Sequence, residues 1–302
     1  MNMKQKEQKI SGGYLINKPQ GITSRQVDNR IGRLLRTRRV GHIGTLDPLA
    51  EGLIPVLVGY STRIAPFLDS GIKAYRGEIS LGITTDTDDS EGEIIERHPV
   101  DISVTKIFEV LKSFLGEIAQ VPPKFSAKKI DGVRMYKRAR RGEDFVIQPK
   151  KVTVYSIENV EIDMPKVRFD IECGTGTYLR AIARDLGNIL GCGGHLSALL
   201  RTRVGPHIIT DAVTLDNVIE SIEKGEPKKY LLTNTELIPH IPCVRIDGMK
   251  VWRVSQGQII PRLGSQFQPG QLFAIIDPHG NIIAIAESVN GAYRYRRVLA
   301  GN

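Results

Sequence analysis

The sequence predicts a mixed α/β (α+β) fold in two parts: a larger one built on a mixed or antiparallel sheet, and a small β-barrel-like module at the C-terminus. The 302 residues exceed the roughly 100 to 200 that are usual for one domain. Before residue 224, apolar residues recur at the spacing of a helix in some segments and alternate with polar residues, as in a strand, in others. Residues 224–242, KGEPKKYLLTNTELIPHIP, have no clear period, so they are predicted to link the two parts.

The first predicted helix begins near Thr23 or Ser24, either of which can cap its N-terminus. Apolar residues follow at i, i+4, i+7 and i+8: Val27, Ile31, Leu34 and Leu35. This spacing predicts one buried face and leaves the opposite face to arginines. The next segment, GHIGTLDPLA (41–50), contains the pair Asp47-Pro48, which is typical of a rigid turn.

Two later segments alternate apolar and polar residues, as half-buried strands do. In KAYRGEISLGI (73–83) the apolar set begins at Tyr75, so this side chain is predicted to point inward. In KVRFDIECG (166–174) the alternation runs to Cys173 and passes through GTGT into the helical run YLRAIARDLGNIL (178–190). The sequence therefore predicts a strand, a glycine turn and a helix start in succession.

The two ends of the chain differ in character. Residues 1–12 carry charge but no apolar core, so we expect a mobile arm and not a signal peptide. Residues 239–302 alternate strand patterns with Gly or Pro turns and end in three arginines, Arg294, Arg296 and Arg297. No apolar run approaches the roughly 18 residues of a membrane span, and we expect a cytoplasmic protein.

Basic residues are clustered along the chain. The formal net charge is +9, and five arginines fall between residues 30 and 39. A denser cluster, KFSAKKIDGVRMYKRARR (124–141), holds eight basic residues and one acid, with Tyr136 among them. One-sign clusters with an interleaved aromatic favour a phosphate backbone over an ordinary solvated helix face. Nucleic acid is therefore the expected partner.

Several motifs fail on spacing. CGTGTYL lacks the third glycine of a dinucleotide fingerprint. DTDDSEGEIIER (86–97) has Glu91 where a calcium loop needs glycine, so we interpret it as an exposed acidic hairpin loop. The six histidines form no i, i+4 pair, so no metal site is expected, and no cofactor. The three cysteines, Cys173, Cys192 and Cys243, are widely spaced, and we expect small buried residues in a reducing compartment.

Six segments match one family in order: NKPQGITS, VGHIGTLDPLAEGLIPVLVG, KAYRGEISLGITTDTDDSEGEI, VPPKFSAKKIDGVRMYKRARRG, GTGTYLRAIARDLG and LSALLRTRVGP. They resemble the TruB family of tRNA pseudouridine synthases, and the C-terminal module resembles the PUA domain that often follows. The resemblance implies isomerisation of uridine to pseudouridine in the T-loop of tRNA, at the position numbered 55. It also implies a catalytic domain over 13–238 and a PUA-like RNA-binding domain over 239–302.

The resemblance implies that Asp47 is the nucleophile. A carboxylate can hold either C6 or C1′ of uridine while the N1–C1′ bond breaks and the base turns. Arg180 is implied as its cationic partner, because a guanidinium stays protonated and grips a carboxylate. Tyr75 and Tyr178 are implied as active-site tyrosines: Tyr75 to stack on the base and offer a route for the C5 proton, Tyr178 to hydrogen-bond near the aspartate and base.

A stacked uridine must be extruded before its glycosidic bond can be reached. His42 resembles the family histidine that fills the vacated place in the stack, and Leu199 matches an apolar wall of the base pocket. Lys18 is expected to contact either RNA or the active-site turn, or else to be a solvated lysine before a Pro turn. The basic segment is expected to clamp the T-arm through Lys128, Lys129, Arg134, Tyr136, Arg140 and Arg141.

Two alternatives stay open. The same chemistry would suit a guide-RNA-dependent pseudouridine synthase subunit, and the same charge would suit a non-catalytic RNA-binding or RNA-folding protein. The DPLAEG form and the basic segment favour the stand-alone tRNA enzyme. We therefore expect a monomer with tRNA as its partner and no obligatory protein partner.

Overall fold

The computed structural model describes residues 10–68, 71–125, 129–130, 133–135, 138, 141, 143 and 145–299. In that part of the chain the largest sheet has ten strands, ordered β14-β1-β3-β12-β4-β11-β10-β7, with β13 on β12 and β2 on β3. The strands are β1 (Gly12–Lys18), β2 (Val40–His42), β3 (Glu51–Val58), β4 (Ile72–Leu81), β7 (Gly116–Gln120), β10 (Lys150–Asp163), β11 (Lys166–Gly174), β12 (Gly194–Val204), β13 (His207–Ile208) and β14 (Val213–Thr214). The β1–β14 and β3–β12 pairs are parallel and the other pairs antiparallel, so the expected mixed sheet is confirmed.

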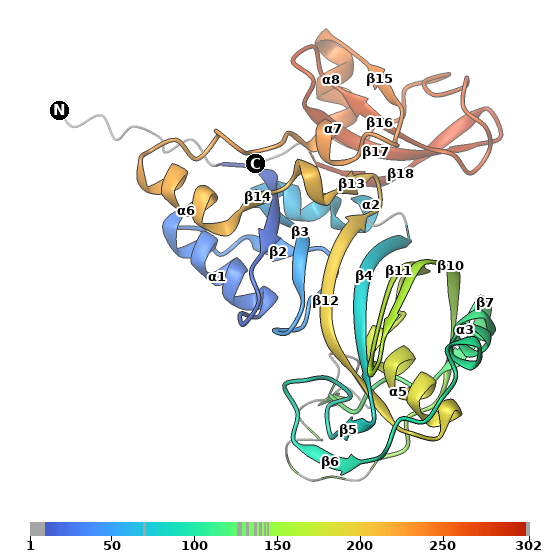
Figure 1. Cartoon of the computed structure of the whole chain (residues 1–302). Coiled ribbons are helices and arrows are strands. Elements are labelled where there is room, and N and C mark those ends of the chain that lie inside the picture. Colours follow the sequence, from blue (N-terminus) through green and yellow to red (C-terminus); the bar gives the residue numbers. More distant parts are fainter. Residues whose placement is uncertain are drawn as a thin grey trace.

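Helices cover two regions of this sheet (Figure 1). Near β1 and β3, α1 (Ser24–Leu34) packs against α6 (Leu215–Glu223). Near β4, β10 and β12 lie α3 (Val104–Ser113) and α5 (Leu179–Leu190). The predicted first helix is confirmed, and Thr23 caps it in a reciprocal capping box.

The periodic residues build the core as expected. On β4, Tyr75 and Ile79 point inward, and Phe169 and Cys173 do so on β11. Apolar residues of α1, α3 and α5 complete the same cluster. The strand, glycine turn and helix start predicted around residues 166–190 are confirmed as β11, a turn and α5.

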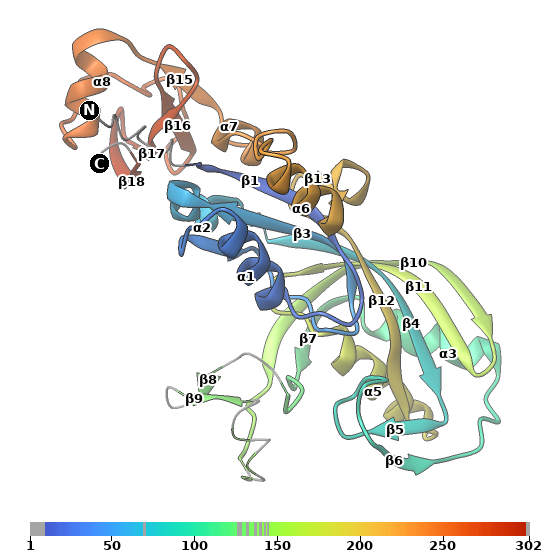
Figure 2. The ribbon, with the colours of Figure 1, turned by 90° about the vertical axis from the view of Figure 1, so that its left-hand side faces the viewer.

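The acidic segment 86–97 is only partly as predicted. It belongs to a hairpin of β5 (Ile83–Thr85) and β6 (Ile94–Arg97), but its loop is not wholly exposed. Asp89 is buried, and Asp88 is partly buried with a left-handed backbone. The acidic composition of this loop suggested full exposure, but the buried Arg180 and the partly buried Arg184 pair with its carboxylates. Figure 2 shows a second small hairpin, β8 (Lys129–Ile130) with β9 (Val133–Arg134), standing away from the large sheet.

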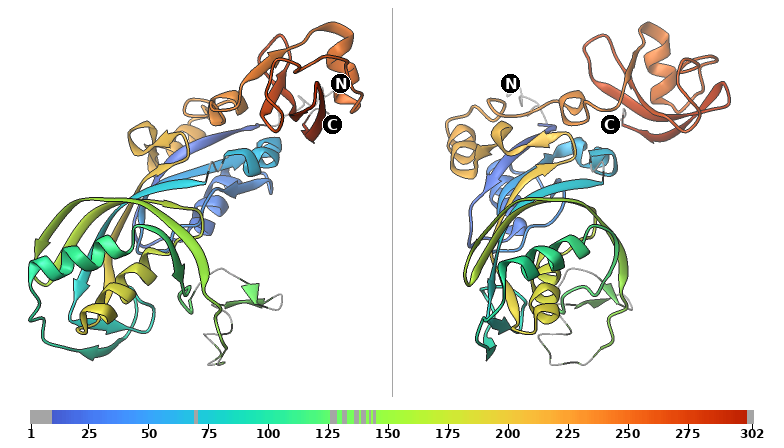
Figure 3. Two further views of the ribbon diagram at one scale, coloured as in Figure 1. Left: turned by 90° about the vertical axis from the view of Figure 1, so that its right-hand side faces the viewer. Right: turned by 45° about the vertical axis from the view of Figure 1, so that its right-hand side comes forward.

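The C-terminal residues form a separate sheet, β15 (Cys243–Arg245), β16 (Leu272–Ile276), β17 (Ile282–Val289) and β18 (Ala292–Val298), with α8 (Gly248–Ser255) beside it (Figure 3). The expected barrel is not confirmed, because the described strands form one open path and no closed barrel. Cys173 and Cys192 are buried as expected, but the expectation for Cys243 was wrong: it is exposed, on the edge strand β15.

One apolar core is shared between the two sheets. Leu15 and Leu57 of the large sheet belong to the same buried cluster as Ile276 and Ile285 of the small one. The segment predicted as a linker contributes as well, because it contains α7 (Asn234–Leu237), and its residues Leu237 and Ile241 are buried in this cluster. In the described chain, no helix is long and apolar enough to cross a membrane.

Candidate active site

The loop 44–50 carries Asp47 between β2 and β3 and is held from behind by the start of α1. Ser24 Oγ donates to the carbonyl of Leu46 and accepts from its N–H, both at 2.9 Å. The N–H of Gly21 donates to the carbonyl of Pro48 at 2.8 Å. The ammonium of buried Lys18 donates to the carbonyls of Pro19 and Ile22. Lys18 therefore holds residues 19–22, which include Gly21, in place. The Asp-Pro turn predicted from sequence is thus tied to α1 before Asp47 and to the loop that precedes α1 after it.

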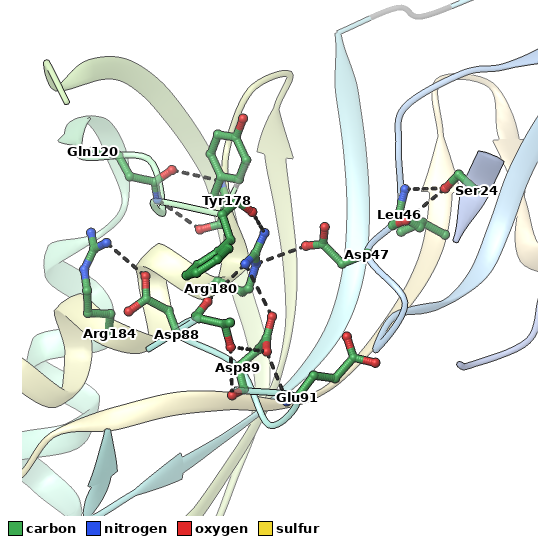
Figure 4. Close-up of polar contacts among 12 residues, drawn as sticks. Ser24, Leu46, Asp47, Asp88, Asp89, Glu91, Gln120, Tyr178, Arg180 and Arg184 are labelled. Atoms are coloured by element: carbon green, nitrogen blue, oxygen red, sulfur yellow. Dashed lines mark hydrogen bonds and ion pairs between the residues drawn. The ribbon is translucent and has the colours of Figure 1, made fainter. Parts of the chain in front are cut away.

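Asp47 faces Arg180 across the site (Figure 4). Arg180 Nε lies 3.0 Å from Asp47 Oδ2, and the arginine side chain is 5% exposed, whereas that of Asp47 is 42% exposed. Burial of its surroundings raises the pKa of Asp47, and the Arg180 guanidinium opposes this shift. The carboxylate is therefore fixed on one side by a permanent cation and open to solvent on the other.

Arg180 also has a second carboxylate partner, which the sequence analysis missed. Asp89 Oδ2 lies 3.4 Å from Arg180 Nη1. The remaining guanidinium donors reach the carbonyls of Thr87 and Phe125 at 3.0 and 2.9 Å. One turn later on α5, Arg184 pairs with Asp88 at 3.1 Å. The two arginines thus hold the acidic loop against the start of α5. The carboxylates of the loop offset the unfavourable position of the Arg180 cation at a helix N-terminus.

The N-terminus of α5 is fixed by a residue that also went unnoticed in the sequence, Gln120 at the end of β7. Its Oε1 accepts from the Tyr178 N–H at 2.8 Å, and its Nε2 donates to the Tyr178 carbonyl at 3.2 Å. Tyr178 is the N-cap of α5 and makes no side-chain cap of its own. Gln120 therefore positions Tyr178, and through it the first turn that carries Arg180.

Tyr75 and Arg201 form the floor of the site. Tyr75 is buried on β4, and burial raises its pKa to about 12, although its hydrogen bond with Arg201 opposes the shift. Arg201, on β12, is fully buried, and it donates to the carbonyls of Leu53 and Gly44 at 2.7 and 2.8 Å. It thereby connects Tyr75 to the backbone on either side of Asp47. No local sequence pattern indicates this role, because it depends on carbonyls that only the folded chain brings near Arg201.

These residues surround one pocket of about 280 Å³. It is lined by Asp47, Tyr75, Tyr178, Arg180 and Leu199, which the sequence analysis singled out, and by others that include Lys73, Thr175, Leu196 and Arg201. The Lys73 ammonium donates to the Thr175 hydroxyl at 3.0 Å at the rim. The structure therefore brings together the four residues implied as catalytic and the apolar wall.

His42 and Lys18 lie close to this pocket without lining it. His42, at the end of β2, contacts Asp28 and Thr45 through its two ring nitrogens. Lys18 is buried, so its interpretation as a solvated lysine was wrong. It contacts the segment 19–22, whose Gly21 is bonded to Pro48. Burial lowers the pKa of Lys18 to about 8, while the carboxylates of Glu91 and Asp47 oppose the shift.

The basic segment is described only in part. Lys128, Tyr136 and Arg140 lie outside the described residues. Lys129 and Arg134 pair through their backbones in the β8–β9 hairpin. Arg141 lies 3.5 Å from Glu143 in an exposed ion pair. Among the described residues, no group of three or more His, Cys, Asp or Glu could hold a metal ion.

Comparisons with known proteins show the family of the chain. Residues 32–179 match the family model of the TruB family pseudouridylate synthase N-terminal domain, and residues 180–235 match the tRNA pseudouridylate synthase B C-terminal domain. The chain is 36% identical over 298 residues to the tRNA pseudouridine synthase B of Thiobacillus denitrificans, covering 99% of each chain. It is 40% identical over 300 residues to that of Thermobifida fusca, covering 96% of this chain and 99% of the relative.

Among solved structures, a chain of an H/ACA RNP bound to a substrate RNA containing 2′-deoxyuridine superposes with a TM-score of 0.73. That chain is 25% identical, and the match covers 96% of this chain and 85% of the other. Fold, site and matches define the class of protein as a pseudouridylate synthase, an isomerase. Within that class, the chain belongs to the TruB family, so the resemblance found in the sequence is confirmed.

Proposed function

We propose that this enzyme isomerises the uridine at position 55 in the T-loop of tRNA, with Asp47 as the nucleophile. The observation that carries the proposal is the 3.0 Å ion pair between Arg180 and a half-exposed Asp47 at a pocket large enough for one pyrimidine. A nucleophile must be ionised and fixed, and the guanidinium does both. The tRNA substrate is the one named for the relatives from Thiobacillus and Thermobifida.

The reaction needs no redox change. Once the base is extruded, the Asp47 carboxylate attacks C6 of the uracil or C1′ of the ribose. The N1–C1′ bond breaks with its electron pair on N1, the base turns, and C5 bonds to C1′. After attack on C1′, the carboxylate leaves C1′ as C5 bonds there; after attack on C6, it leaves C6 by elimination. The proton on C5 is lost and N1 takes up a proton, so substrate and product are isomers and the carboxylate is regenerated.

Tyr75 is proposed to stack on the base and to relay the C5 proton. With a pKa of about 12, Tyr75 is a neutral phenol near pH 7. Its oxygen can therefore accept the C5 proton only while its own hydroxyl proton is passed on to another acceptor. Arg201 can only donate, so the phenol oxygen accepts from Arg201 and its own proton is free to point elsewhere. Tyr178 is proposed to hydrogen-bond near Asp47 and the base, with Leu199 as the apolar wall beside the base.

RNA binding is proposed to use three further regions. His42 fills the place of the extruded base, the segment 124–141 clamps the T-arm, and residues 239–302 act as a PUA-like module. The proposed organisation keeps the domain limits expected from sequence, with an arm over 1–12 and the catalytic domain over 13–238. The enzyme is proposed to work as a monomer in the cytoplasm. Affinity for a T-arm hairpin should fall steeply with salt, by about 0.7 to 0.9 log units per log unit of salt for each phosphate neutralised.

Tritium release from a T-arm hairpin labelled with [5-³H]uridine tests the proposal. Every route to pseudouridine expels that hydrogen, and binding alone does not. Wild type should release tritium, and Asp47→Asn should release none while it binds the hairpin as tightly. Release that survives in Asp47→Asn would remove Asp47 from its role, whereas tight binding without release by either protein would favour a non-catalytic RNA-binding protein.

A guide-RNA-dependent enzyme is the second candidate, because the fold is shared with a chain of an H/ACA RNP. The same assay separates the two. Release from bare hairpin, with no guide or accessory protein present, supports the stand-alone enzyme. Release that appears only after a guide RNA is supplied supports the second candidate.

A further inference from the structure

Asp28 on α1 contacts His42 but has no role in the reaction proposed above. Its side chain is 3% exposed, and its Oδ2 lies 2.9 Å from Nδ1 of His42. Its other oxygen, Oδ1, is buried and has no hydrogen-bond partner in the described structure. Arg25 is the second cation nearby, but it is 72% exposed and 3.5 Å away. A buried carboxylate with so few partners is expensive to maintain, which indicates a function for its contact with His42.

The contact fixes the orientation of the imidazole. A carboxylate only accepts, so Nδ1 of His42 must carry a proton and donate it to Asp28. Nε2 lies 3.1 Å from the Thr45 hydroxyl, so both ring nitrogens are already engaged. The imidazole edge is therefore bound to the protein, and only its faces can contact RNA. This geometry suits stacking and leaves neither nitrogen for proton transfer.

The same helix holds both ends of the segment that leads to the nucleophile. Ser24 and Asp28 are four residues apart on α1 and therefore lie on one face. Ser24 bonds to Leu46, directly before Asp47, and Asp28 bonds to His42, at the start of the segment. The same helix therefore positions both His42, whose ring would enter the RNA stack, and Asp47, whose carboxylate would attack.

We propose that Asp28 is a positioning residue for base extrusion: it holds the His42 ring so that a face of the imidazole replaces the target base in the RNA stack. This inference rests on the proposed function, specifically on the role of His42. Without Asp28 the ring keeps only its contact with Thr45, so more orientations are open to it and the stacked one has to be selected from several. The loss should appear in extrusion and not in the initial binding of the hairpin.

The test compares Asp28→Leu, Asp28→Asn and His42→Ala on a T-arm hairpin with 2-aminopurine next to the target uridine. Its fluorescence rises when the neighbouring base leaves the stack, whether or not isomerisation follows. Asp28→Leu should reduce the extrusion rate about tenfold, within the range that one stacked base is worth. Asp28→Asn keeps an acceptor for Nδ1–H and should restore most of the rate. The hairpin's Kd should change little in either variant.

A double mutant separates positioning from general structure. Asp28→Leu in the His42→Ala background should cause no further loss, because the ring that it positions is gone. Independent, multiplicative losses would overturn the proposal, and so would a wild-type extrusion rate in Asp28→Leu. A variant that loses extrusion only because it unfolds would lower Tm and would not be rescued in the Asn form. Failure of the proposed function would instead show as absent tritium release from wild type.

Discussion

Asp89 lies 3.4 Å from Nη1 of Arg180, on a different nitrogen from the one that faces Asp47. One guanidinium thus pairs with a buried carboxylate, Asp89, and with a half-exposed one, the proposed nucleophile Asp47. Asp89 is itself fixed, because its Oδ1 accepts from the Thr87 hydroxyl and from the Glu91 N–H. The ion pair of Asp47 and Arg180 is therefore part of a larger network, in which Asp47 is half exposed and Asp89 is buried.

Removing the charge of Asp89 should weaken both the fold and the reaction. Asp89→Asn leaves Arg180 with one carboxylate partner, so we expect a loss of about 2 kcal/mol in the free energy of unfolding. We also expect slower tritium release, because the guanidinium is less firmly held. Urea denaturation and the release assay measure the two effects. Glu93→Gln, an exposed acid of the same loop, is the matched control and should change neither. An unaltered Asp89→Asn enzyme would show that the network is not needed.

The acid limb of the pH profile should report Asp47. The proposed nucleophile reacts as a carboxylate, so kcat/KM should fall as pH decreases through a pKa above the usual value of about 3.9. Asp89 contributes to that raised pKa by charge repulsion. Asp89→Asn should therefore move the acid limb to lower pH, and Glu93→Gln should leave it in place. A limb that moves upward in Asp89→Asn would contradict this assignment.

Asp47→Asn should be no less stable than wild type at neutral pH. A carboxyl whose pKa is raised by folding binds protons more tightly in the folded state than in the unfolded state. Ionised Asp47 therefore destabilises the fold, and this effect grows as pH rises from about 4 through the raised pKa. Because Asp47 is half exposed, solvent screening limits the gain in the variant to about 1 kcal/mol or less. Urea denaturation at pH 4 and pH 8 measures it, and a variant gain that is larger at pH 4 would refute the sign.

Gly44 should be sensitive for two separate reasons. Its φ of +67° is in the left-handed region, and an added Cβ would lie 3.0 Å from both Arg201 Nη1 and Lys73 Cε. Gly225 has a φ of +80° with open space around it, so Gly225→Ala reproduces the backbone strain alone, about 1 to 2 kcal/mol. Gly44→Ala should add a loss of kcat, because Arg201 must move away from the loop. Equal kcat values in the two variants would argue against a role for the Arg201 contact.

The sequence predicted those parts of the site that lie in local patterns. Strand alternation placed Tyr75 inward, and the helix start after the glycine turn placed Arg180 at an N-terminus that needed an anion nearby. It could not predict which carboxylate would pair with Arg180, because Asp89 lies 91 residues earlier in the chain. Buried Arg201 was missed for a related reason, since burial of a charge depends on backbone carbonyls that only the folded chain assembles.

The apolar core that the two sheets share gives the enzyme a fixed geometry along its substrate. Because Leu15 and Leu57 pack in one cluster with Ile276 and Ile285, the C-terminal sheet is not free to swing about a tether. An RNA that touches both the small sheet and the pocket must present those two points at one separation. The distance between these two points is therefore constant, and we expect a tRNA arm of the wrong length not to reach the proposed nucleophile even where its loop sequence is correct.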